Sequence, residues 1–130
     1  MMQYDPHRPV DATIWQAKDT AERIEAVLKY HRGQKIRLPN AQMHALIHTV
    51  VENQIAEGDT LPAKAALTRL MNEGLDRHEA VHALGSVVAA EIFRVQRDKT
   101  PTDPIAYSLK LERLTAESWR SQFQTSESTD

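Results

Sequence analysis

The chain has 130 residues, 41% hydrophobic and 26% charged, a composition that fits one ordinary globular domain and argues against a two-domain enzyme or a disordered chain. Its 16 Lys and Arg against 18 Asp and Glu give a net charge of -2, which disfavours general nucleic-acid binding. Without cysteine, any metal must be held by His and carboxylate side chains. No signal peptide and no apolar run of about 18 residues is apparent, so we expect a cytoplasmic protein that does not enter membranes.

Helices separated by short connections are predicted along the whole chain. The four glycines and six prolines fall between segments of helical periodicity, and no segment alternates like a strand. We therefore expect an all-α fold, a single-domain bundle of about five helices at residues 12–31, 41–57, 62–73, 77–97 and 104–120. The helical domain would cover residues 11–122, between an extended N-terminal segment at 1–10 and a disordered polar tail at 123–130.

Four of the six histidines form two pairs with i,i+4 spacing, His44 with His48 and His78 with His82. Two imidazoles one helical turn apart share a face and can coordinate a single cation. Glu52 continues the first row; a helical wheel places His44 inside the apolar arc, His48 at its edge and Glu52 at its rim. We predict a metal site between the two helices, with these five residues as ligands.

The donor types suit a divalent transition metal, with zinc or iron favoured over magnesium or calcium. If the ion keeps an open coordination position, Glu79 or Glu52 would be the candidate catalytic base, and the protein would be a metal-dependent enzyme of unknown reaction. The alternative is a metal-free helical module for protein–protein interaction, in which the histidines are hydrogen-bonded. A homodimer in which each subunit supplies one pair is a further possibility.

Residues 78–82 also read H-E-x-x-H, the signature of zinc metalloproteases. Three observations argue against a protease: Glu79 has the spacing of a capping box with Asp76, no strand is available to hold a peptide, and the third downstream ligand is missing. A standard di-iron carboxylate site is also disfavoured, because it needs the Glu-x-x-His pattern twice.

A few further positions are expected to serve the fold. Gln54 lies near the middle of an apolar face, so we expect it to hydrogen-bond to another helix rather than to a metal-ligating histidine. Gly85 and Ala89, on the margin that carries the second histidine pair, would let another helix approach closely. The two remaining histidines, His7 and His31, lie in or near predicted loops and are expected at the surface.

Several separate motifs resemble a small bacterial family known only as a domain of unknown function. They are His44-x-x-x-His48-x-x-x-Glu52-x-Gln54, Ala65-Ala66-x-x-Arg69-Leu70, His78-Glu79-Ala80-x-His82-Ala83, and Gln96-Arg97 followed by Thr100-Pro101, Asp103 and Ala106-Tyr107. The resemblance covers roughly half of the chain, from Asn40 to Tyr107, and members of that family carry similar histidine pairs. It implies a helical fold and no particular activity.

Overall fold

Seven α-helices and one short 3₁₀ helix make up most of the residues that the computed structural model describes, 3–33 and 40–128. In chain order they are α1 (Ala12–Gln16), α2 (Thr20–Gly33), α3 (Ala41–Ala56), η1 (Gly58–Thr60), α4 (Ala63–Asn72), α5 (Arg77–Asp98), α6 (Pro104–Arg113) and α7 (Ala116–Ser128). No strand occurs within the two described ranges, which confirms the all-α prediction. None of the described helices combines the length and apolarity needed to cross a membrane.

The expected number of about five helices is too low, because two of the predicted helices are interrupted. The first, expected at 12–31, is divided into α1 and α2, and Asp19 accepts a hydrogen bond from the Glu22 backbone N–H at the new start. The last, expected at 104–120, ends at Arg113, and Thr115 Oγ1 accepts from the Ser118 backbone N–H as α7 begins. Capping side chains of this kind satisfy the free N–H groups of a first helical turn.

The two ends of the chain differ in how they meet the helices. Residues 3–10 contain no helix, yet Tyr4 and Pro6 are buried against the helical domain. At the other end, α7 continues to Ser128, into the segment 123–130 that was expected to be a disordered tail. Residues 1–2 and 129–130 lie outside the described part of the chain, so the outer boundaries of the expected segments stay predictions.

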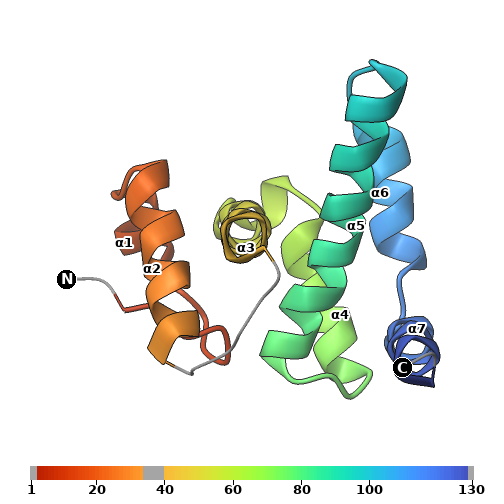
Figure 1. The fold of residues 1–130 in the computed structure, drawn as a ribbon, viewed down its shortest axis with the longest axis horizontal. Coiled ribbons are helices and arrows are strands. Elements are labelled where there is room, and N and C mark those ends of the chain that lie inside the picture. Colours follow the sequence, from red (N-terminus) through yellow and green to blue (C-terminus); the bar gives the residue numbers. More distant parts are fainter. Residues whose placement is uncertain (1–2, 34–39, 129–130) are drawn as a thin grey trace.

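Helix α3 is the central element, and Figure 1 shows it end-on between the α1–α2 pair and α5. Its aliphatic side chains Ile47 and Val51 pack into a core formed with α4, α5, α6 and α7. Gly85 of α5 permits this approach, because a Cβ atom there would lie 2.9 Å from Cγ2 of Ile47. Tyr107 of α6 donates a hydrogen bond to Gln54 Oε1 at 3.1 Å, so the expected interhelical partner of Gln54 is found.

A second, smaller core joins α1 and α2 to the opposite side of α3. It is built around Trp15 and Val27, both fully buried, with Ala45 of α3. Trp15 Nε1 donates to Asn53 Oδ1 at 2.8 Å, and Arg23 Nη1 donates to the same oxygen at 2.9 Å. Helix α3 is therefore covered on two sides, which removes the solvated rim that a single amphipathic helix would have.

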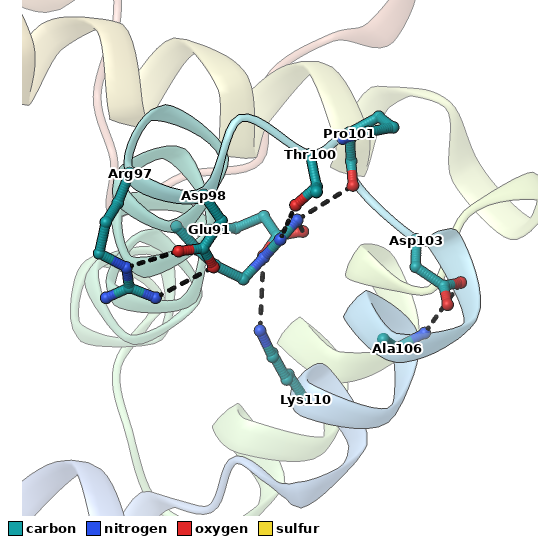
Figure 2. Close-up of polar contacts among 9 residues, drawn as sticks. Glu91, Arg97, Asp98, Thr100, Pro101, Asp103, Ala106 and Lys110 are labelled. Atoms are coloured by element: carbon teal, nitrogen blue, oxygen red, sulfur yellow. Dashed lines mark hydrogen bonds and ion pairs between the residues drawn. The ribbon is translucent and has the colours of Figure 1, made fainter.

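The turn between α5 and α6 is fixed by polar contacts at the far end of α5 (Figure 2). Arg94 donates to Glu91 Oε1 at 2.8 Å, to Thr100 Oγ1 at 2.8 Å and to the Pro101 carbonyl at 3.1 Å. Lys110 of α6 lies 3.4 Å from the same Glu91 oxygen. These contacts hold α6 against α5, well along the helix from the histidines.

Candidate metal centre

Five histidines from three helices converge on the side of α3 that faces α2 and the start of α5. They are His31 of α2, His44 and His48 of α3, and His78 and His82 of α5. His48 is the centre of the group, with its ring centroid 4.6–5.6 Å from the other four. The structure thus brings together the two histidine pairs singled out in the sequence and adds a fifth imidazole, and we call these five residues the histidine cluster.

The Nε2 atoms of the histidine cluster are the ones that could hold a cation. Those of His48 and His82 lie 3.0 Å apart. Those of His31, His44 and His78 are buried and have no hydrogen-bond partner among the residues that the structure describes. Two overlapping groups, His31 with His48 and His78, and His44 with His48 and His82, place one nitrogen of each member within 4.8 Å of the others. These groups could each hold a metal ion.

Two hydrogen bonds set the ring tautomers that a metal would need. His31 Nδ1 lies 2.8 Å from the Val27 carbonyl, and since a carbonyl only accepts, Nδ1 carries the proton and Nε2 keeps a lone pair. The Tyr4 hydroxyl donates to Glu52 Oε2 at 2.7 Å, and its oxygen lies 3.0 Å from His48 Nδ1. His48 Nδ1 must then donate to Tyr4, which again leaves the lone pair on Nε2.

Glu52 supports the cluster indirectly, through an ion pair and Tyr4. Its side chain is 0% exposed, and Arg77 donates to Oε1 at 2.8 Å and to Oε2 at 2.9 Å from a guanidinium that is 3% exposed. Arg77 also donates to the Pro6 carbonyl at 3.0 Å. Both Glu52 oxygens are therefore engaged, and Glu52 belongs to neither group of potential metal ligands. The rim position expected from the helical wheel is wrong, because residues 3–8 and α5 cover this side of α3.

Glu79 lies at the start of α5 in the capping box expected from its spacing. Its backbone N–H donates to Asp76 Oδ1 at 2.8 Å, and its Oε1 accepts from the Asp76 backbone N–H at 3.2 Å. The side chain is exposed, and it is absent from both groups of potential ligands among the described residues. The hydrogen bonds of Glu79 with Asp76 show that it caps the start of α5.

Burial favours the neutral, metal-binding form of four members of the cluster, His44, His48, His78 and His82, by lowering their pKa values. It lowers the pKa of His44 to about 4 and that of His82 to about 3, with the neighbouring imidazoles as the next cause. The pKa values of His48 and His78 are lowered for the same reason. Burial, helped by the charge of Glu52, also raises the pKa of Tyr4 well above its usual value, so the phenol keeps the proton that it donates.

Three residues of this site were missed in the sequence. His31 was expected at the surface but is only 4% exposed, and this correction has a local explanation. His31 follows Val27 by four residues and Ile24 by seven, which places it on the apolar face of α2. Tyr4 and Arg77 carry no such signal, because their partners are distant in sequence. His7, the other surface expectation, is about half exposed and touches only the edge of the cluster through the His78 ring.

A family model for a domain of unknown function, DUF1841, matches residues 16–113. The chain belongs to this family. The matched range contains all five members of the histidine cluster together with Glu52 and Arg77, whereas Tyr4 and His7 precede it. This agrees with the resemblance to an uncharacterised family inferred from the sequence. Neither curated proteins nor solved structures gave a match.

Proposed function

We propose that this protein binds one divalent transition-metal ion in the histidine cluster. The observation that carries the proposal concerns the five Nε2 atoms: three are buried with no hydrogen-bond partner among residues 3–33 and 40–128, and the other two lie 3.0 Å apart, within hydrogen-bonding distance of each other. A buried polar atom without a hydrogen bond costs about 1–3 kcal/mol, so histidines that served only the fold would be expected to have partners. A cation held by three of these nitrogens, as in either group of potential ligands, would give its ligands a partner.

A single ion is favoured over two because both groups of potential ligands contain His48. The Nδ1 atom of that residue is engaged with Tyr4, so only Nε2 offers a lone pair, and one lone pair binds one ion. The two groups are then best understood as two overlapping parts of one site.

The donor set also bears on which metal is bound and on what the site does. Imidazole nitrogens favour zinc, iron, copper and nickel over magnesium and calcium, and we propose zinc or iron. Glu79 is exposed at a helix cap, and Glu52 is held by Arg77 and Tyr4. We therefore assign neither glutamate a catalytic role, and the proposed function is metal binding without a stated reaction.

The test is the metal content of untagged protein purified without chelators, measured by mass spectrometry. We expect near-stoichiometric zinc or iron in the wild type and in His7→Ala, whose side chain lies at the outer edge of the site. We expect loss of the metal in His44→Ala, His82→Ala and His31→Ala. The last variant separates a site of three helices from one formed by α3 and α5 alone.

Circular dichroism spectra would establish that each variant is folded before its metal content is compared. A folded, metal-free wild type that also fails to take up added zinc or iron(II) would contradict the proposal. In that case a metal-free interaction module becomes the better description, and size-exclusion chromatography and partner searches would replace metal analysis.

A further inference from the structure

The potential ligands of the histidine cluster supply no negative charge to a divalent cation. The five imidazoles are neutral when they bind a metal. The nearest buried carboxylate, Glu52, is paired with the guanidinium of Arg77 through two hydrogen bonds of 2.8 and 2.9 Å. The combined charge of these seven side chains is zero.

Two other carboxylates act on the cluster electrostatically, and neither is placed to neutralise a bound ion. Asp76 and Asp5 both influence the pKa of His78. Asp76 is exposed and accepts from the Glu79 backbone N–H, while Asp5 is 45% exposed and accepts from the His7 backbone N–H. Their fields are therefore screened by solvent, which reduces their effect on a buried charge.

We infer that the metal ion of this site takes a small anion from solution as an additional ligand. This inference rests on the proposed function and extends it to a ligand class, small monoanions. A divalent ion held by neutral ligands would keep its full charge of +2 in a largely buried site, and burying an uncompensated charge is costly. An anionic ligand lowers that charge, so it is favoured over a neutral ligand of similar size.

The position of the cluster is compatible with entry of such a ligand. His31 and His48 are buried, whereas His44, His78 and His82 are partly exposed. The ion would therefore lie close below the surface, on the side where α5 begins. Because the Nε2 atoms of His31, His44 and His78 are buried, only an anion of a few atoms is expected to reach the ion.

The experiment uses cobalt(II), whose visible absorption bands report directly on the ligands of the ion. The full-length protein is loaded with cobalt(II) and titrated with sodium azide at constant ionic strength. A parallel titration uses acetonitrile, a neutral donor that, like azide, is linear with three heavy atoms. We expect a saturable one-to-one change of the cobalt bands with azide, and a weaker affinity for acetonitrile.

The outcomes separate this inference from the proposed function. Cobalt bands that azide does not change, or acetonitrile binding as tightly as azide, would overturn the anion inference while leaving metal binding intact. The absence of any protein-bound cobalt bands would overturn both.

A pair of charge variants tests the electrostatic reason. Glu52→Gln leaves Arg77 without its counterion and makes the site more positive, so azide should bind severalfold more tightly to the cobalt protein. Glu91→Gln removes a carboxylate from a second ion pair of α5, nine residues beyond His82, and should leave azide affinity unchanged. An equal effect of the two variants would contradict the inference. If Glu52→Gln does not fold, the wild-type titration with azide and acetonitrile still decides.

Discussion

The two faces of α3 are built on different principles. Toward α4 and α5, the face with Ile47 and Val51 packs aliphatic side chains, and its polar exception, Gln54, is hydrogen-bonded to α6. Toward α2 and the start of α5, the face with His44 and His48 buries imidazoles, and Nε2 of His44 has no hydrogen-bond partner within the described part of the chain. Aliphatic burial accounts for stability on the first face, whereas the second face buries polar atoms at a cost, which supports the proposed metal site.

Two buried glutamates of the described residues, Glu52 and Glu91, differ in how far water reaches their ion-pair partners. Glu52 pairs with an arginine that is 3% exposed, so water has almost no access to either charge. Glu91 pairs with Arg94 and Lys110, whose side chains are 26% and 45% exposed. Ion pairs that water can reach lose little when one partner is removed, and buried pairs lose much.

The largest expected effect is the loss of Arg77. Arg77→Met leaves the Glu52 carboxylate buried without its counterion and should lower the free energy of unfolding by about 3–5 kcal/mol. Arg94→Met, the matched change at the ion pair with Glu91, should have a much smaller effect because water reaches this pair. Urea denaturation of both metal-free proteins at pH 7 measures the difference. Similar losses in the two variants would show that the Glu52 pair is not the buried element described above.

Acid should lower the free energy of unfolding through the histidines, whereas the contribution of the aliphatic core should not depend on pH. His44 and His82 have pKa values of about 4 and about 3 in the folded state, below the usual value of about 6.5. As the pH falls below about 6.5, the unfolded chain binds protons that the folded chain does not. The free energy of unfolding should then fall by about 1.4 kcal/mol per pH unit for each such histidine.

Urea denaturation of the metal-free protein between pH 7 and pH 5 tests this dependence. The double variant His44→Gln/His82→Gln should show a shallower dependence on pH. Leu70→Ala, which creates a cavity in the aliphatic core, should instead cost about 2–5 kcal/mol at both pH values. A wild type whose stability is flat across this range would contradict the lowered pKa values.

A smaller effect is expected from the Tyr4 hydroxyl, which links the histidine cluster to the ion pair of Glu52 and Arg77. Tyr4→Phe removes the group that orients His48 and should weaken zinc binding by about 10–100-fold, the usual effect of a residue that supports a metal ligand. Competition with a chromophoric chelator measures the affinity. Tyr107→Phe, a matched change on the aliphatic side of α3, should leave it unchanged. Equal affinities in wild type and Tyr4→Phe would contradict the orienting role.

The smallest expected effect is the loss of stability caused by Tyr107→Phe. Tyr107→Phe removes the hydrogen bond to Gln54 and should lower the free energy of unfolding by about 1 kcal/mol. Thermal unfolding followed by circular dichroism would detect the change. A variant as stable as the wild type would indicate that water replaces the phenol as the partner of Gln54.

Features that depend on neighbours within one or two helical turns could be predicted from the sequence. The spacing of the histidine pairs placed each pair on one helix face, and the Asp76 and Glu79 spacing identified the capping box that the structure contains. The interruptions at Asp19 and Thr115 were also local, and their capping patterns were present in the chain although the helical periodicity outweighed them. Periodicity and capping can be read from sequence because they involve groups only three or four residues apart.

Which sides of each helix are buried depends on contacts with other elements, and it could not be predicted from one helix at a time. Glu52 was expected at the rim of its helix but is buried, because residues 3–8 and Arg77 cover it. The contacts responsible join residues as many as 71 positions apart in the sequence. His31 joined the histidine cluster because α2 packs along α3. One helix shows where its apolar stripe lies, but it does not show whether a second element covers the polar edge. That depends on how distant segments meet, and it turned two histidine pairs into a site of five imidazoles supported by Tyr4, Glu52 and Arg77.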